Sequence, residues 1–503
     1  MTRLFLTLFA VLVVFGSRAA ASSQNDDLTV YTKHGAIHGA IDPSTPNVRQ
    51  FLGIPYAQPP INTLRFAPPK PALPFDSLNA TRMSPSCMQY ANTISGINVN
   101  DILEFNLGGL NGTTSPISED CLTLSMWTPR HVPTTAKLPV IVFFYGGAFL
   151  LGGTDTPYQI PSRWIERSQS HIVISFNHRD GIFGYPNAAG LPLQSQNIAL
   201  LDIRLAIEWV RDNIASFGGD PSRIGLWGPS SGAIAIAYYT YTYVADPIIN
   251  SVILDSGNEF IDILTYDDAH ANFTAVAARF GCGELSPVQE LECMRRVDAL
   301  SIMEFLHQWS DNGTTPLFTF SPVVDNLTVL GNYSAAKMAK IPALIGSTAQ
   351  DGNMFVPYDP DGVDEAAADE ITMVWFFCPA YRAAKKRVRE GVEEVYRYVY
   401  AGNFSNVSPR GWMGAFHGSE MPLVFGTHGL WRGASTVLEE ETSRVMQDVW
   451  VEFVATGGRI TTVERWDGEG VDGGRVVEFG NSVPARVVDM GEKEKVCRDM
   501  GLG

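Results

Sequence analysis

The stretch Gly228-Pro229-Ser230-Ser231-Gly232 lies between two short apolar runs, residues 224–227 before it and residues 233–237 after it. It matches the pattern G-x-S-x-G, with the strand before it and the helix after it that a nucleophile elbow requires. In so tight a turn the side chains two residues from the serine would collide, and glycine at both positions relieves the crowding. The sequence therefore predicts a reactive serine, Ser230, at the end of a strand.

The composition of the chain is that of an ordinary globular protein. The 503 residues are 45% hydrophobic and 18% charged, which are values of folded domains. The formal net charge of −17 argues against nucleic-acid binding, because a phosphate backbone requires a basic face. Internal repeats, low-complexity tracts and Pro/Ser-rich linkers are absent from the sequence. We therefore expect one large domain, residues 22–503, with its oligomeric state left open.

The N-terminus has the features of a secretory signal peptide. Arg3 supplies a positive charge, residues 4–15 form an apolar core, and Ala19-Ala20-Ala21 offers small residues for cleavage before Ser22. The apolar core is too short for a membrane span, which needs about 20 residues. We expect residues 1–21 to be removed and the mature protein to be secreted and extracellular.

Two further features agree with export. The sequence contains eight N-x-[ST] sequons, which predict a glycoprotein, at Asn79, Asn111, Asn272, Asn312, Asn326, Asn332, Asn403 and Asn406. Its six cysteines are even in number, as an oxidising compartment would suggest. No cysteine pair has C-x-x-C spacing and none has a nearby histidine, so we expect no metal site. Spacing alone favours only one pairing, Cys282 with Cys293.

Apolar and amphipathic runs alternate along the chain, which is typical of α/β proteins. We expect strands over residues 138–145, 171–176, 224–227, 252–254 and 342–345. We expect helices over residues 201–214, 380–400 and 437–456. The pattern predicts a central, mostly parallel twisted sheet with helices on both faces and long insertions.

A serine nucleophile needs a histidine base, and in elbow enzymes the histidine follows the serine and the acid in the chain. Four histidines follow Ser230, namely His270, His307, His417 and His428. His417 lies in a loop-like segment, residues 414–420, where flanking glycines could hold an imidazole at the rim of a sheet. His428, in Thr427-His428-Gly429, is the alternative.

Two carboxylates compete for the role of the acid between the serine and the histidine. Asp351 follows the apolar run at residues 341–346 and falls in the loop beyond a strand's carboxyl end, where α/β active sites gather. Asp325 follows another apolar run, and its structural interpretation is an Asx turn that closes that run.

A glycine-rich loop follows the first strong strand. Residues 138–145 run into Gly146-Gly147-Ala148-Phe149, a loop of the type that forms oxyanion holes. Small residues there allow backbone N–H groups to approach a substrate carbonyl, where negative charge develops in the transition state.

With these segments in order, the sequence resembles the type-B carboxylesterase/lipase family, which includes cholinesterases and secreted fungal lipases. The matching segments span residues 51 to about 430 and lie at residues 51–57, 118–122, 145–149, 177–179, 213–221, 228–232 and around His417. The resemblance implies the α/β-hydrolase fold and a secreted carboxylic ester hydrolase that needs no cofactor.

The resemblance also implies a role for each site residue. Ser230 is expected to be the nucleophile, Asp351 the acid and His417 the general base. The expected oxyanion donors are the backbone N–H groups of Gly147, Ala148 and Ser231. The family pattern adds the disulfides Cys87–Cys121 and Cys378–Cys497. The family's elbow usually reads Gly-Glu-Ser-Ala-Gly, so Pro229 and Ser231 depart from it, and the acid is more often glutamate.

In this family the loop closed by the first disulfide lies over the active site, and here it comprises residues 88–120. It contains no tryptophan, the residue with which cholinesterases hold a quaternary ammonium group; its aromatic residues are Tyr90 and Phe105. We therefore expect a neutral ester substrate rather than a choline ester.

The same loop also carries seven aliphatic and aromatic side chains, at Ile97, Val99, Ile102, Leu103, Phe105, Leu107 and Leu110. They are consistent with a surface loop that packs inward, or with a mobile lid that implies contact with a lipid interface. A different class of function is also open: relatives that lack the serine act as binding or adhesion proteins.

Overall fold

The computed structural model describes residues 27–105, 117–133, 135–462 and 474–503. The predicted signal peptide, residues 1–21, lies outside the described residues, as do the sequon at Asn111 and the loop residues Leu107 and Leu110.

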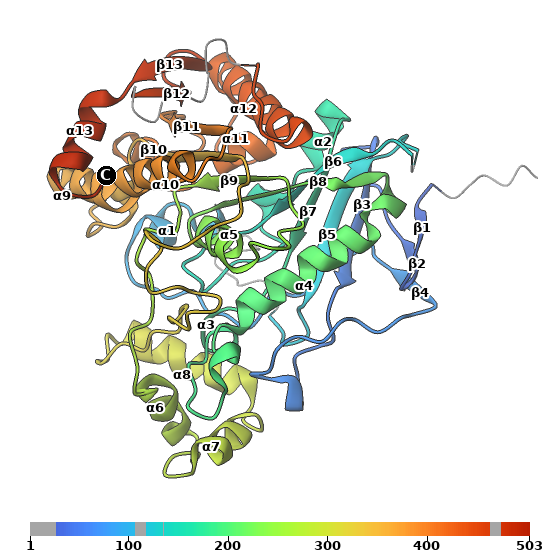
Figure 1. Cartoon of the computed structure of the whole chain (residues 1–503), viewed down its shortest axis with the longest axis vertical. Helices are drawn as coiled ribbons and strands as arrows, with labels where there is room; N and C mark the ends of the chain where they lie inside the picture. Colours follow the sequence, from blue (N-terminus) through green and yellow to red (C-terminus); the bar gives the residue numbers. More distant parts are fainter. Residues whose placement is uncertain (1–26, 106–116, 134, 463–473) are drawn as a thin grey trace, which may run out of the picture.

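A ten-stranded sheet crosses the centre of the molecule in the order β13-β12-β11-β10-β9-β8-β6-β7-β5-β3 (Figure 1). The strands from β7 to β12 in this order are parallel to one another, whereas β3, β5 and β13 pair antiparallel. Their bounds are β3 Val48–Pro55, β5 Thr123–Pro129, β6 Leu138–Phe143, β7 Ile172–Phe176, β8 Gly219–Pro229, β9 Ser251–Asp255, β10 Ala343–Thr348, β11 Val395–Tyr400, β12 Arg475–Phe479 and β13 Ala485–Asp489. A small sheet contains β1 Thr29–Thr32, β2 Gly35–His38 and β4 Ser77–Asn79.

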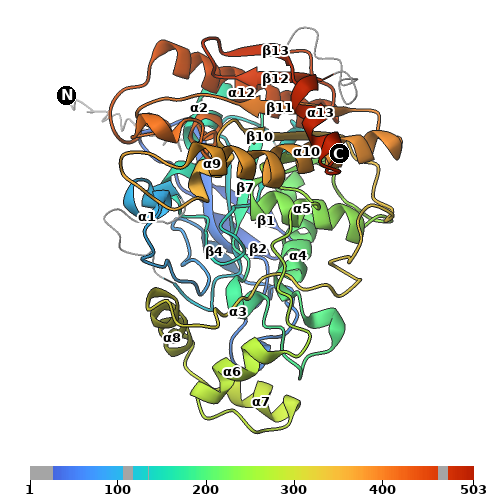
Figure 2. The ribbon, with the colours of Figure 1, turned by 90° about the vertical axis from the view of Figure 1, so that its left-hand side faces the viewer.

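Helices cover both faces of the large sheet (Figure 2). The helices α4 (Ile198–Asn213), α5 (Ser231–Thr242) and α10 (Cys378–Arg389) pack on one face, and α2 (Ser162–Ser168), α11 (Met421–Phe425) and α12 (Val437–Thr456) pack on the other. Strand β6 shows the reason for this arrangement. Its fully buried residues alternate, with Val140 and Val142 in one core and Ile141 and Phe143 in the other. The predicted α/β fold is confirmed.

Seven further α-helices lie within the described residues. They are α1 Ile97–Asn100, α3 Gly181–Gly184, α6 Ala271–Arg279, α7 Pro287–Met294, α8 Ala299–Asp311, α9 Glu365–Ile371 and α13 Gly491–Asp499. Helices α6, α7 and α8 form a lobe away from the large sheet (Figures 1 and 2), with an apolar core of its own around Phe273 and Leu306.

One predicted helix, residues 380–400, is wrong in its second half. Helix α10 ends at Arg389, and Gly391, with φ 82°, turns the chain into strand β11. The six residues of β11 are Val-Tyr-Arg-Tyr-Val-Tyr, and all of them are buried. Such a β-branched and aromatic run favours a strand that is covered on both faces, so the sheet determined this segment.

The helix predicted over residues 437–456 is confirmed as α12. Thr436 and Glu439 form a capping box at its start, and Gly457, with φ 69°, ends it in the left-handed conformation. The three expected disulfides are also present, joining Cys87 to Cys121, Cys282 to Cys293 and Cys378 to Cys497.

The described sequon asparagines differ in accessibility. Asn79, Asn312, Asn326, Asn332 and Asn403 are exposed, and Asn272 is half-buried. Asn406 is only 3% exposed, and its side-chain N–H donates to the carbonyl oxygen of His428 at 3.0 Å. Asn406 is therefore the least accessible of the described sequon asparagines. Across the described ranges, no helix combines the length and the apolar character that crossing a bilayer would require.

Candidate active site

The elbow residue Ser230 lies between strand β8 and helix α5. Its backbone, with φ 53° and ψ −128°, is in a conformation that residues with a side chain rarely adopt. A Cβ atom at Gly228 would lie 2.5 Å from the carbonyl oxygen of Phe144, and one at Gly232 would lie 2.4 Å from the same oxygen. The two flanking glycines are therefore required because the end of β6 passes directly against the elbow.

The segment that presses against the elbow continues as residues 145–149, here called the oxyanion loop. A Cβ atom at Gly147, where φ is 126°, would lie 2.1 Å from the carbonyl oxygen of Leu151, so only glycine fits. Ala148 and Phe149 follow with φ 58° and 61°. The first helical residue after the elbow is Ser231, and the backbone N–H groups at a helix N-terminus favour negative charge.

Ser230 and His417 line one cavity of about 260 Å³, together with Gly147 and Ala148. Most of its wall is apolar, with Phe105, Phe355 and Phe416 supplying aromatic rings. Besides Ser230 and His417, the polar side chains are those of Asn92, Asn98 and Gln159. Pro229 stands at the cavity wall where the family usually has glutamate. In the described part of the chain, no Asp, Glu, Lys or Arg side chain lines this cavity.

His417 and Asp351 form a close pair at the edge of the cavity. Nδ1 of His417 lies 2.7 Å from Oδ1 of Asp351. Asp351 is fully buried, and its other oxygen accepts hydrogen bonds from the Ser256 hydroxyl at 3.0 Å and the Thr348 N–H at 2.9 Å. The other ring nitrogen of His417, Nε2, is buried and has no hydrogen-bond partner among the described residues. It is available to exchange a proton with a group in the cavity.

The position of His417 follows from contacts between its loop and the end of β10. The N–H of Gln350 donates to the carbonyl oxygen of Ala415 at 3.0 Å, and the N–H of Ala415 donates to the side chain of Gln350 at 2.9 Å. The rings of Phe355 and Phe376 pack against the imidazole at centroid distances of 5.1 and 4.9 Å. The loop is therefore fixed next to Asp351, which starts the 3-10 turn Asp351–Met354.

The competing residues serve other contacts. Oδ1 of Asp325 accepts the backbone N–H groups of Leu327, Thr328 and Val329, so Asp325 closes its own loop. Nδ1 of His428 lies 2.6 Å from the Ser435 hydroxyl and 3.3 Å from Oε1 of Glu439. Neither Asp325 nor His428 lines the cavity that holds Ser230.

Two buried carboxyl groups near the site were missed in the sequence. Asp255 ends strand β9 and accepts hydrogen bonds from the Trp227 indole and the Tyr398 hydroxyl. Burial raises the pKa of Asp255 above the usual range. Glu420 lies three residues after His417, and burial, followed by the charges of Asp255 and Asp351, raises its pKa well above the usual range. In the sequence, Asp255 could have been found as a carboxylate that ends an apolar strand and is followed by Ser256 and Gly257.

The described part of the loop closed by the first disulfide packs inward. Ile97, Ile102 and Phe105 are buried, and Phe105 stacks on Tyr158 with ring centroids 4.3 Å apart. Arg410 pairs with Asp101 at 2.7 Å, and Arg432 pairs with Glu104. These contacts hold residues 97–105 against the body of the protein.

Within the described ranges, no three His, Cys, Asp or Glu side chains come together in a group that could hold a metal ion.

Comparison with known proteins assigns the chain to a family. The family model described as "Carboxylesterase family" matches residues 26–373 and 359–480. A chlorogenic acid esterase from Aspergillus niger is 41% identical over 445 residues, which cover 87% of this chain and 84% of that protein. Secreted lipase 5 from Gibberella zeae is 39% identical over 461 residues, which cover 85% of each. An acetylcholinesterase from Electrophorus electricus is 26% identical over 91% of this chain and 85% of that protein.

These matches extend over most of the chain and agree with the parallel sheet and the strand–turn–helix at Ser230, so the resemblance seen in the sequence is confirmed. The protein belongs to the carboxylesterase family and is a carboxylic ester hydrolase.

Proposed function

We propose that the protein is a secreted serine carboxylesterase in which Ser230, His417 and Asp351 form the catalytic triad. The observation that carries this proposal is the single cavity lined by Ser230, His417, Gly147 and Ala148, with Asp351 2.7 Å behind the imidazole. The secreted lipase among its relatives supports an extracellular location.

The first half of the reaction forms an acyl-enzyme. Nε2 of His417 takes the proton of the Ser230 hydroxyl as the serine oxygen attacks the ester carbonyl. Asp351 orients the imidazole and stabilises the imidazolium cation. The N–H groups of Gly147, Ala148 and Ser231 stabilise the tetrahedral oxyanion, each contributing on the order of 3 kcal/mol to lowering the barrier. The imidazolium then protonates the departing alcohol, and the carbonyl re-forms as an acyl-serine ester.

The second half releases the acid. His417 takes a proton from a water molecule, which attacks the acyl-serine carbonyl through a second oxyanion. The serine oxygen leaves and regains a proton from His417, which restores the free enzyme.

The chemistry of the cavity favours a neutral ester with an apolar acyl or aryl group. Its wall carries no charged side chain among the described residues, and Phe105 and Phe416 provide flat apolar surfaces. The cavity is less suited to a cationic choline ester, because Pro229 replaces the glutamate that the family usually has beside the nucleophile. We further propose that residues 97–105 act as a fixed wall of the cavity. This segment cannot move away from the cavity unless the Arg410–Asp101 and Arg432–Glu104 ion pairs break.

A series of p-nitrophenyl esters from short to long acyl chains, with chlorogenic acid and an emulsified triglyceride alongside, tests this function. We expect activity on the short and medium p-nitrophenyl esters and none in the variant Ser230→Ala. If activity rises sharply once the substrate aggregates, residues 97–105 act as a lid that opens at a lipid interface and not as a fixed wall. Wild-type activity no greater than that of Ser230→Ala on every ester would leave the alternative, a binding protein.

A further inference from the structure

The backbone of the oxyanion loop is strained and needs support from contacts outside the loop. Ala148 and Phe149 both lie in the left-handed region, with φ 58° and 61°. Residues with a Cβ atom adopt this conformation only where the surrounding structure enforces it. Two consecutive residues of this kind lie where the N–H groups of Gly147 and Ala148 must point at one atom of the substrate. Contacts outside the loop must therefore set its shape.

The segment after strand β7, residues 178–181, supplies contacts at both ends of the loop. At the far end, the N–H of Gly181 donates to the carbonyl oxygen of Phe149 at 2.8 Å. At the near end, the Tyr145 hydroxyl accepts the N–H of His178 at 3.1 Å and lies 3.2 Å from Oδ2 of Asp180. The Tyr145 ring also stacks on the imidazole of His178, with centroids 4.5 Å apart and planes 17° apart.

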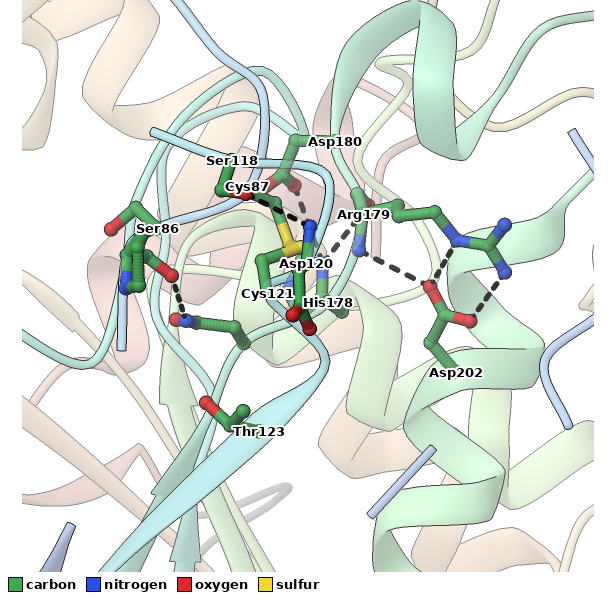
Figure 3. Close-up of a disulfide and its surroundings, with 12 residues drawn as sticks. Ser86, Cys87, Ser118, Asp120, Cys121, Thr123, His178, Arg179, Asp180 and Asp202 are labelled. Carbon is green, nitrogen blue, oxygen red and sulfur yellow. Dashed lines mark hydrogen bonds and ion pairs between the residues drawn. A yellow bond between two sulfur atoms is a disulfide. The ribbon is translucent and has the colours of Figure 1, made fainter. Parts of the chain in front are cut away.

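His178 and Asp180 form a buried pair beneath the loop. Nδ1 of His178 lies 3.3 Å from Oδ1 of Asp180, and the two residues are 3% and 1% exposed. Figure 3 shows them beside the Cys87–Cys121 disulfide, with Asp202 on the other side of Arg179. Arg179 holds Asp202 with two hydrogen bonds of 2.8 and 2.6 Å. Because Asp202 already has this partner, Asp180 is the counter-ion of His178.

The surroundings of His178 set the direction in which its pKa shifts. Burial alone would lower the pKa of His178, but the charge and hydrogen bond of Asp180, the carbonyl oxygen of Arg179 and the charge of Asp202 together raise it. The buried hydroxyls of Tyr56, Tyr145 and Tyr185 also lie in this region, and their pKa values are raised well above the usual range, chiefly by burial. An imidazole whose Nδ1 faces the Asp180 carboxylate and the Arg179 carbonyl oxygen holds one ring orientation, and Tyr145 stacks on that ring.

We propose that His178 and Asp180 are positioning residues, which act through Tyr145 to aim the N–H groups of the oxyanion loop. The inference rests on the proposed function, in which Gly147 and Ala148 stabilise the oxyanion. Neither His178 nor Asp180 lines the cavity, so the pair affects the transition state through the loop rather than through contact with the substrate. Loss of the charge on Asp180 frees the imidazole on which the Tyr145 ring stacks and weakens the contact of Asp180 with the Tyr145 hydroxyl, and the loop relaxes away from its strained conformation.

The variant Asp180→Asn tests this, because it keeps the size of the side chain and removes its charge. We would measure kcat and KM on p-nitrophenyl butyrate, and the inhibition constant of an alkyl trifluoromethyl ketone, whose adduct with Ser230 carries an oxyanion. We expect kcat to fall about 10- to 100-fold and the inhibition constant to rise by a similar factor, with KM nearly unchanged. Tyr145→Phe removes the hydroxyl alone and should give the same split, so it carries the test if Asp180→Asn fails to fold.

The matched control is Glu494→Gln, which removes one charge from the buried Arg397–Glu494 pair between β11 and α13, on elements that do not line the cavity. It should lower Tm and leave kcat and the inhibition constant as in the wild type. A folded Asp180→Asn protein with wild-type kcat and inhibition constant would overturn the inference, as would a rise in KM with no change in inhibition. A wild type that neither cleaves the ester nor binds the ketone would overturn the proposed function, and this inference with it.

Discussion

Asp351 and His417 are 66 residues apart in the chain, and Oδ1 of Asp351 lies 2.7 Å from Nδ1 of His417. The second oxygen of Asp351 accepts two further hydrogen bonds, from Ser256 and Thr348. Three donors thus fix the carboxylate, and its position in turn fixes the imidazole. The pair is built at the carboxyl ends of two neighbouring parallel strands, since Ser256 follows β9 and Thr348 ends β10.

The first prediction concerns this carboxylate. Asp351→Asn should lower kcat by about three to four orders of magnitude, because an amide in its place stabilises the wrong imidazole tautomer. Steady-state kinetics on a p-nitrophenyl ester would measure the loss. Asp325→Asn is the control: it should lower stability, since Asp325 accepts several backbone N–H groups, but leave kcat of the folded protein close to that of the wild type. A larger loss of kcat in Asp325→Asn would show that the acid has been misassigned.

The second prediction concerns the elbow. Gly232→Ala should reduce both stability and kcat, because its Cβ would lie 2.4 Å from the carbonyl oxygen of Phe144 and 2.7 Å from that of Tyr145. Relief of this overlap pushes on the start of the oxyanion loop and costs about 1 to 3 kcal/mol of stability. Gly411→Ala is the matched control, because no atom lies within 4 Å of its Cβ. Thermal unfolding and kcat of the two variants would be compared, and equal values would contradict the prediction.

The third prediction concerns the disulfides. Cys378–Cys497 joins residues 119 positions apart, whereas Cys282–Cys293 joins residues 11 positions apart. In the chain-entropy account the longer loop stabilises by about 4 to 5 kcal/mol and the shorter one by about 3 kcal/mol. Replacing both cysteines of a pair with alanine should therefore lower Tm more for Cys378 and Cys497. Denaturant unfolding of the two double variants would measure the difference, and the opposite order would exclude loop entropy as the main cause.

The fourth prediction concerns Glu420, whose folded pKa lies well above its unfolded value mainly because of burial. Above the unfolded pKa, the unfolded chain releases this proton while the folded protein keeps it, so stability falls as pH rises through this window. Each unit of the shift corresponds to about 1.4 kcal/mol. Glu420→Gln has no proton to release.

The measurement for Glu420 is the free energy of unfolding at pH 5 and at pH 8. We expect the wild type to lose more stability between these two values than Glu420→Gln does, whichever protein is the more stable at pH 5. Equal losses in the two proteins would mean that Glu420 ionises normally in the folded state.

Local sequence was sufficient where a function depends on the backbone of a few consecutive residues. The G-x-S-x-G pattern and the Gly146-Gly147 pair are local patterns, so the elbow and the glycine-rich loop could be predicted. The capping box at Thr436 and the glycine at position 457 fixed both ends of helix α12 in the same way. The contacts that require glycine at positions 228 and 232 are made with Phe144, which only the assembled sheet brings to the elbow.

The sequence failed where burial on both sides determines the structure. Residues 395–400 follow a helix after a short turn, and their amphipathic context favoured a longer helix. They form strand β11 because β10 and β12 lie on either side of them and both faces are covered. A local sequence pattern does not show which distant segments of the chain will lie beside a strand.

The sequence by itself determined the α/β fold, Ser230 as the candidate nucleophile and the glycine-rich oxyanion loop, because each is marked by a local sequence pattern. It left two aspartates and two histidines in competition, with Asp351 and His417 favoured by the loops in which they lie and by the family resemblance. Only the tertiary structure brought Asp351 to His417 and placed Asp325 and His428 in contacts of their own. It also placed Asp255 and Glu420 behind the site and His178 and Asp180 beneath the oxyanion loop. These groups act through distance and burial, which exist only once the strands are assembled.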